Sequence, residues 1–302
     1  MTASRWLARL ALSVGGLLFS SGLLAQGAAV PSPTLERIVA RQAIYVGYRE
    51  AAVPFSYLLP GQAVPVGYVW EVCAHVLKAV EGRLGKAVPV VPVSVTDNAR
   101  TMMLKTGIVD LDCGAAGNTV ARQKQVDFST NIYISEIKVL VKKDAGFSSF
   151  EQFAGKPVVT VSGGTAERHV KLAALKFNIS LQHLLANSPA EAMAMLARGA
   201  ADAYVAEDAV VVAQRAASPG DFVLLDAALA TEPFAIMLPK DDPGWKKLVD
   251  ETIAGLMQRG ELAQIYEKWF LSPIPPAGLN LNLPMSQLLK AAIQEPGDTP
   301  VN

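Results

Sequence analysis

The stretch MMLKTGIVDLDCG, residues 102–114, decides the fold of this chain, because a related stretch, AMLARGAADAYVA, follows at residues 194–206. Each reads as the end of a helix, then a glycine, then a short strand that carries aspartate. Glycine ends helices readily because it adopts a left-handed backbone conformation that other residues resist. The recurrence predicts two similar units in one chain.

Helices and strands alternate on both sides of these two stretches. In the first half we expect a helix at 34–42 capped by Thr34, a strand at 43–50, a helix at 67–84 and a buried strand at 87–95, whose prolines suit a strand start or a sheet edge. A helix at 98–107 and a strand at 108–114 follow. A second series follows at 150–177 and 188–216, and residues 232–270 read as one strand and two helices. Such alternation is typical of an α/β fold with parallel strands, here as two similar lobes with a ligand between them.

The N-terminus predicts export. Residues 1–27 combine Arg5 and Arg9 with an apolar run and small residues near a cleavage site at about 25–29, which favours a cleaved signal peptide over a membrane anchor. Removing them takes away two of 27 basic residues and none of 27 acidic ones, so 25 against 27 leaves a net charge of −2. Nucleic acid is therefore an unexpected partner, because no basic excess is present to neutralise phosphates.

The sequence offers little for catalysis or for a metal ion. It has no G-x-S-x-G elbow, Walker loop, H-E-x-x-H or C-x-x-C. We expect its three histidines, His75, His169 and His183, to face solvent, and no cluster suggests a metal or other cofactor. The two cysteines, Cys73 and Cys113, are disulfide candidates in an exported chain, although both could instead be small buried apolar residues.

Three arginines indicate a pocket for a small anion. Arg49, Arg100 and Arg122 each lie at the end of a strand or the start of a helix. Ligands of open α/β sheets bind at the carboxyl ends of strands, and guanidinium groups hold carboxylates with paired hydrogen bonds. The small residues from Gly114 through Ala115 would let the ligand approach the backbone.

The second half supplies a complementary set. The turn SGGT, from Ser162 to Thr165, opens a helix whose free N–H groups suit a carboxylate. Glu207 or Asp208, at the end of the strand ADAYVAED, residues 201–208, could face an ammonium group.

The motifs YVGYRE, PFSY, DNAR, NTVARQKQVDFS, SGGTAE and EKWFLSPIPPAGLNLN together resemble the periplasmic solute-binding proteins of polar amino acid ABC transporters (family 3). The resemblance covers nearly the whole mature chain and is greatest to the glutamate/aspartate-binding branch. It implies a periplasmic, monomeric binding protein of the two-lobed type II fold, each lobe a mixed, mostly parallel sheet flanked by helices. Residues 34–140 and 235–302 would form lobe 1, residues 141–234 would form lobe 2, and a membrane permease would be the partner.

The resemblance also implies roles for the site residues. Arg49 and Arg100 would hold the side-chain carboxylate of an acidic amino acid, Arg122 with Thr165 the α-carboxylate, and Glu207 the α-ammonium. The sequence departs from the branch at the hydroxyl residues of the site. Asp97 stands in place of a serine, Ala115 and Ala116 replace hydroxyl residues, and a histidine of the branch falls near Pro189. A related dicarboxylate is therefore an alternative ligand.

Two other functions remain open at this point. One is a periplasmic enzyme on the same fold, similar to cyclohexadienyl dehydratases, in which Asp97 could act as an acid or base. Asp97 lies beside Arg100, however, so its pKa should fall, and we expect it to cap the helix that follows. The other is a sensor that reports ligand binding to a membrane receptor.

Overall fold

The computed structural model of this chain describes residues 30–217 and 220–301, and the expected signal peptide lies outside them. In this part of the chain the α-helices are α1 (Pro33–Arg41), α2 (Tyr68–Leu84), α3 (Arg100–Lys105), α4 (Val120–Gln123), α5 (Thr165–Lys176), α6 (Pro189–Ala197), α7 (Asp208–Ala217), α8 (Pro243–Gln258), α9 (Glu261–Phe270) and α10 (Gln287–Gln294). The strands are β1 (Ile44–Tyr48), β2 (Ala51–Ala52), β3 (Ser56–Tyr57), β4 (Val90–Ser94), β5 (Leu111–Gly117), β6 (Asp127–Phe128), β7 (Tyr133–Lys142), β8 (Pro157–Val161), β9 (Gln182–Ala186), β10 (Ala203–Glu207), β11 (Phe222–Leu224) and β12 (Ala230–Leu238). Two short 3-10 helices are η1 (Lys143–Ala145) and η2 (Phe150–Phe153).

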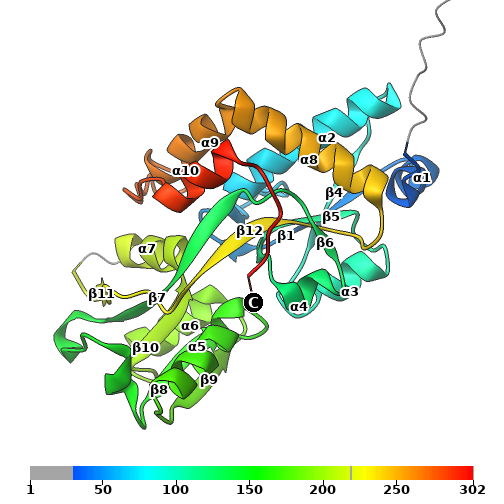
Figure 1. Cartoon of the computed structure of the whole chain (residues 1–302). Helices are drawn as coiled ribbons and strands as arrows, with labels where there is room; N and C mark the ends of the chain where they lie inside the picture. The colour runs from blue at the N-terminus through cyan, green and yellow to red at the C-terminus, as the bar shows by residue number, and fades with distance from the viewer. Residues whose placement is uncertain (1–29, 218–219, 302) are drawn as a thin grey trace, which may run out of the picture. The chain divides into compact units, whose positions relative to one another are not determined.

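One sheet runs through both halves, in the order β4-β1-β5-β12-β7-β10-β8-β9. The strands β4, β1 and β5 are parallel to one another, and so are β9, β8 and β10. Each parallel group is bordered by one antiparallel strand, β12 beside β5 and β7 beside β10. In Figure 1 the two groups lie on opposite sides of the pair β7 and β12. The chain therefore forms two lobes of matching topology, as the sequence predicts.

The recurrent stretch occupies equivalent places in the two lobes. In lobe 1 it forms α3, Gly107 and β5, and in lobe 2 it forms α6, Gly199 and β10. Both glycines are left-handed, with φ of 70° and 76°. A residue with a Cβ would be strained in this conformation, which explains why glycine stands at both positions.

The two lobes are joined by the longest strands of the sheet. β7 and β12 pair with each other in antiparallel register from Ala230–Ile137 to Phe234–Tyr133. The boundaries expected between the lobes, after residues 140 and 234, fall within these two strands. Each strand continues into a lobe, where β12 pairs with β5 and β7 pairs with β10. Two crossing strands of this kind permit hinge movement between lobes.

An aromatic cluster fixes lobe 1 to the crossing strands. The ring of Tyr133, on β7, stacks on Phe270 of α9 at 5.3 Å and meets the edge of Phe55 at 5.0 Å. Phe55 in turn contacts Phe234 of β12, with ring centroids 5.4 Å apart. Because aromatic pairs bury large apolar areas, this cluster gives the hinge a rigid base on its lobe 1 side.

Two local predictions were wrong. Thr34 does not cap α1, because Ser32 is the N-cap and its hydroxyl accepts from the Leu35 N–H, while Pro33 starts the helix. The strand expected to be buried at 87–95 is the edge strand β4, and its side chains are half-buried or exposed. Its proline at position 92 suits an edge, where a missing N–H breaks no ladder bond.

The disulfide prediction is confirmed. Cys73 of α2 and Cys113 of β5 are bonded, and both are fully buried. The bond ties α2 to the strand residue that directly precedes Gly114. No helix in the described part of the chain is long and apolar enough to cross a membrane, and its acidic, histidine and cysteine side chains form no group suited to a metal ion.

Candidate ligand-binding site

A cavity between the lobes is lined by residues from both lobes, and several of them lie at or just after the carboxyl ends of parallel strands. Lobe 1 and the crossing strand β12 contribute Arg49, Ala52, Phe55, Asp97, Gly114, Ala115 and Phe234. Lobe 2 contributes Val161, Gly164, Ala166, Pro189, Tyr204, Val205, Ala206, Glu207 and Val210. In this conformation the cavity has a volume of about 30 Å³, which is room for roughly two water molecules. The lobes are thus closed around a small space.

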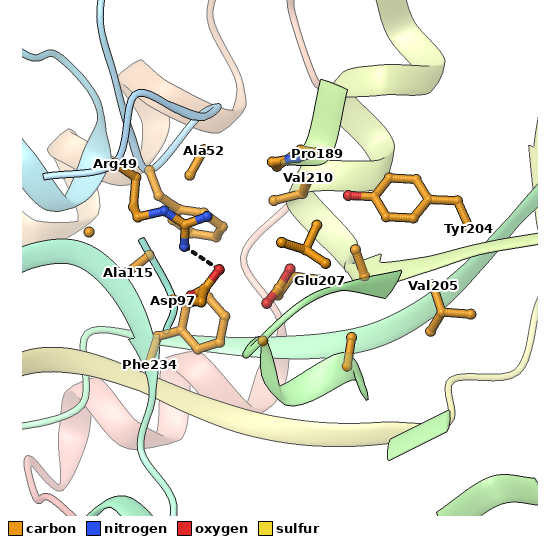
Figure 2. Close-up of a pocket in the computed structure, with 16 residues that line it drawn as sticks. Arg49, Ala52, Asp97, Ala115, Pro189, Tyr204, Val205, Glu207, Val210 and Phe234 are labelled. Carbon is orange, nitrogen blue, oxygen red and sulfur yellow. Dashed lines mark ion pairs between the residues drawn. The ribbon is translucent and has the colours of Figure 1, made fainter. Parts of the chain in front are cut away.

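Asp97 forms ion pairs with two arginines at one end of the cavity. Its Oδ2 lies 2.6 Å from Nη1 of Arg49, and its Oδ1 lies 2.5 Å from Nη2 of Arg100. Figure 2 shows the ion pair between Arg49 and Asp97, with the Glu207 side chain close to it. Burial alone would raise the pKa of Asp97, but the two guanidinium groups outweigh it and lower that pKa. The N-cap prediction was wrong, because α3 has Ala99 as its N-cap and no side-chain cap.

Arg100 also contacts the backbone at Ala115 and the side chain of Asp112. Nη1 of Arg100 donates to the Ala115 carbonyl at 2.9 Å, and Asp112 lies 3.5 Å from the same nitrogen. Ala115 is left-handed, with φ of 59°, at a bulge in the pairing of β5 with β12. Strain of this kind is held in place by its surroundings and is typical of binding sites.

Gly114 must be small because Arg49 and Asp112 pack against it. A Cβ at this position would lie 2.7 Å from Cγ of Arg49 and 2.8 Å from Oδ1 of Asp112. The group that approaches this turn closely is thus a protein side chain, and contact with a ligand stays a prediction. Gly114 and Ala115 both line the cavity.

Arg122 connects the two lobes. It follows Thr119, the N-cap of α4, and its guanidinium donates to the carbonyls of Gly117 and Gly163, each at 3.1 Å. Gly163 belongs to lobe 2, so this bond spans the gap between lobes. Burial, and next the positive charge of Arg100, lower the pKa of Arg122 to about 10. An anion placed between Arg100 and Arg122 would offset the effect of burial and of the neighbouring positive charge, and so raise the pKa of Arg122 again.

A second contact holds the lobes together beside Arg122. The Asn98 side chain donates to the Ser162 hydroxyl at 3.2 Å. Gly163, next in the chain, has φ of 76°, and a Cβ there would lie 2.2 Å from Oδ1 of Asn98. The predicted SGGT turn therefore meets lobe 1 directly, and only a glycine fits this approach.

Of the two acidic residues expected to face an ammonium group, Glu207 lines the cavity. Burial, with a smaller contribution from Glu232, raises the pKa of Glu207 to about 7. Asp208 lies outside the lining, where its carboxylate accepts from the Tyr133 hydroxyl at 3.1 Å and from the Ser135 hydroxyl at 3.0 Å. Burial raises the pKa of Asp208 to about 6. These contacts give Asp208 a part in fixing α7 to β7.

Thr165 and Ser162 lie at the start of α5 but outside the lining, where Gly164 and Ala166 are the nearest members. The Thr165 hydroxyl donates to the buried carboxylate of Glu232. His169, one turn along α5, lies 3.2 Å from the same carboxylate. His169 is buried, so the expectation that it faces solvent was wrong.

The sequence analysis did not identify three aromatic residues of the cavity lining, Tyr204, Phe55 and Phe234. Tyr204 is fully buried, and its hydroxyl has no hydrogen-bond partner among the described residues although it belongs to the lining. Phe55 and Phe234 belong to the same lining. Tyr204 lies inside the recurrent stretch but near the amino end of β10, so a search of carboxyl strand ends could not have found it.

Comparison with known proteins agrees with this geometry. Two α/β lobes joined by two crossing strands and closed around a small cavity define a protein of the type II periplasmic-binding fold. Residues 44–272 match the family model of bacterial extracellular solute-binding proteins, family 3. The chain therefore belongs to that family.

Two relatives are similar over most of their length. The L-glutamate/L-aspartate-binding protein of Pseudomonas aeruginosa is 37% identical, over 88% of this chain and 89% of its own. The glutamate/aspartate import solute-binding protein of Escherichia coli is 34% identical, over 97% of this chain and 98% of its own.

A solved structure also resembles the chain. An ancestral amino acid-binding protein, described as a precursor of cyclohexadienyl dehydratase, has a TM-score of 0.67 and is 26% identical. The match covers 79% of this chain and 99% of that one.

Proposed function

We propose that this protein captures an amino acid between its lobes, outside the cytoplasmic membrane, and delivers it to the permease of an ABC transporter. The relatives are named for glutamate and aspartate, which supports an acidic amino acid or a related dicarboxylate as the ligand class. The observation that carries the proposal is the cavity itself, which is enclosed by both lobes and lined by Arg49, Asp97 and Glu207, whereas Arg100 and Arg122 lie outside the lining. Periplasmic location, cleavage near residues 25–29 and a monomeric state are parts of the same proposal.

The residue roles follow from the charges around the cavity. Arg122 binds the α-carboxylate, because its pKa is lowered in a position where an anion would restore it. Glu207 binds the α-ammonium, and the Tyr204 hydroxyl gains its missing partner from the ligand. Arg49 and Arg100 form the end of the site that meets the ligand side chain.

Closure is the event that the permease recognises. We assign residues 34–140 and 235–302 to lobe 1 and residues 141–234 to lobe 2, so that both hinges fall within β7 and β12. The cavity is too small for an amino acid while the lobes and side chains stay as they are. Entry therefore requires opening, and the contacts of Arg122 and Asn98 with lobe 2 form again on closure.

The proposal is tested by isothermal titration of ligand-stripped protein with L-glutamate, L-aspartate, their amides and dicarboxylates without an amine. We expect amino acids to bind with dissociation constants of about 1 μM or lower, or about −8 kcal/mol. D-amino acids serve as the control, because a site that contacts the α-carboxylate, the α-ammonium and the side chain together distinguishes enantiomers. Absence of binding by every L-amino acid in the panel would contradict the proposal.

Affinity for an amino acid should depend on pH through Glu207. Its pKa of about 7 means that it is mostly protonated at pH 6 and mostly ionised at pH 8. Only the ionised form pairs with an ammonium, so affinity should rise up to about tenfold between these two values. Titration calorimetry at pH 6, 7 and 8 measures this change. Glu207→Gln should bind more weakly and lose the pH dependence, and a retained dependence would assign it to another group.

A dehydratase is the second candidate function. Glu207 favours it, because a buried carboxyl group with a pKa of about 7 in a cavity has the properties of a general acid or base. Incubation with prephenate or arogenate, followed by absorbance, separates the two functions. We expect no turnover, since Glu207 is assigned to binding the ammonium. Turnover that disappears in Glu207→Gln would establish the enzyme.

A further inference from the structure

The end of the cavity that would meet a ligand side chain already contains a carboxylate. Asp97 reaches both guanidinium groups, at 2.6 Å from Arg49 and 2.5 Å from Arg100. All three side chains are largely buried, with exposed fractions of 13% for Arg49, 7% for Asp97 and 3% for Arg100. Buried pairs of this kind are held strongly, because breaking one leaves an uncompensated charge.

We infer that Asp97 takes the place of a second ligand carboxylate on Arg49 and Arg100, and so shifts the preference of the site from acidic amino acids toward those with an uncharged polar side chain. This inference rests on the proposed capture of an amino acid and moves the expected ligand from the acidic class to the uncharged polar one. It makes Asp97 the specificity-determining residue of the site.

The balance of charge supports the inference. Three charged residues line the cavity, Arg49, Asp97 and Glu207. Close to them lie Arg100, Arg122, Asp112 and the buried Glu232, whose charge acts on both Arg122 and Glu207. With Glu232 counted, the carboxylates outnumber the arginines. A zwitterionic amino acid adds no net charge, whereas an acidic one adds an unbalanced negative charge in a buried place.

The hydrogen bonds of Arg100 also favour a ligand with an uncharged polar side chain. Arg100 already donates to Asp97 and to the Ala115 carbonyl, and its Nη1 lies near Asp112. Among the described residues, its remaining nitrogen, Nε, is buried without a partner. An acidic ligand side chain that reached either arginine would place a second carboxylate beside that of Asp97, where the two like charges repel. An amide can instead donate to the Asp97 carboxylate and leave both ion pairs intact.

The test compares Asp97→Asn and Asp97→Ser with the wild type. Asp97→Asn keeps the shape of the side chain and removes its charge, and Asp97→Ser removes most of the side chain as well. Asp202→Asn, at a partly exposed aspartate 4.0 Å from Lys156, is the matched control. Titration calorimetry at pH 8 gives dissociation constants for L-glutamate against L-glutamine and for L-aspartate against L-asparagine.

We expect the ratio of acid to amide dissociation constants to fall by roughly 10- to 100-fold in both Asp97 variants, the size of a charge-assisted hydrogen bond. The control should keep the wild-type ratio. A ratio in the variants within about twofold of the wild type, or a ratio that rises, would overturn the inference. Since Asp97→Ser leaves more space than Asp97→Asn, agreement between the two separates the effect of charge from a local change of packing.

The two proposals fail in different ways. Binding with an unchanged ratio overturns the role of Asp97 and leaves the amino acid-binding function intact. Absence of binding of all four amino acids by wild type and folded variants, with folding checked by circular dichroism, overturns both.

Discussion

Replacement of Arg122 by alanine is expected to weaken amino acid binding by at least about 100-fold, because a buried guanidinium makes two charge-assisted hydrogen bonds to a carboxylate, each of roughly 1.5–3 kcal/mol. The substitution also removes the bond from Arg122 to the Gly163 carbonyl, so the closed arrangement of the lobes loses a contact. Titration calorimetry of Arg122→Ala measures the loss.

Two further variants make this prediction specific. Arg122→Lys keeps a positive charge but loses the paired geometry, so its affinity should lie between wild type and Arg122→Ala. Arg168→Ala, at an exposed arginine on α5, should bind like the wild type. If Arg122→Ala bound the ligand within about fivefold of the wild-type affinity, Arg122 would not be a ligand-binding residue.

Loss of the disulfide should produce the largest change in stability. Cys73 and Cys113 are 40 residues apart, and a cross-link over a loop of this length stabilises a fold by about 4 kcal/mol in the chain-entropy model. The double variant Cys73→Ala, Cys113→Ala should unfold at lower urea concentration by a matching amount. Chemical denaturation with and without dithiothreitol measures it.

The reductant provides the control for this prediction. It should destabilise the wild type and leave the double variant unchanged, because the variant has no disulfide to reduce. A double variant as stable as the oxidised wild type would show that the bond contributes nothing to the free energy of unfolding. Because Cys113 directly precedes Gly114 in β5, we also expect the variant to bind its ligand more weakly.

The recurrent stretch was enough to predict the architecture. A helix that stops at glycine and continues as a strand is a local pattern, and Gly107 and Gly199 have the left-handed conformation that this pattern requires. Arg49, Gly114, Ala115 and Glu207 could be placed near a cavity for a similar reason, since strand ends converge in this fold.

Predictions failed where contacts between distant segments decide the outcome. Asp97 reads as a helix cap in the sequence, but Arg49, 48 positions away along the chain, competes for its carboxylate. His169 reads as a surface residue because nothing nearby in sequence shows that Glu232 will lie against it. Thr165 and Asp208 have the expected residue types at the expected strand ends, yet each is occupied by a partner outside the cavity.

The central claim is that an amino acid is captured by closure of the two lobes, and small-angle X-ray scattering tests it most directly. Profiles would be recorded for ligand-stripped protein and for protein saturated with the tightest ligand of the calorimetric panel. Gly163→Ala would be measured in parallel, because its Cβ would collide with Asn98 in the closed form. We predict that ligand makes the wild type more compact, that its profile then fits this structure, and that Gly163→Ala stays more extended. A ligand that binds the wild type without changing its scattering profile would contradict the account.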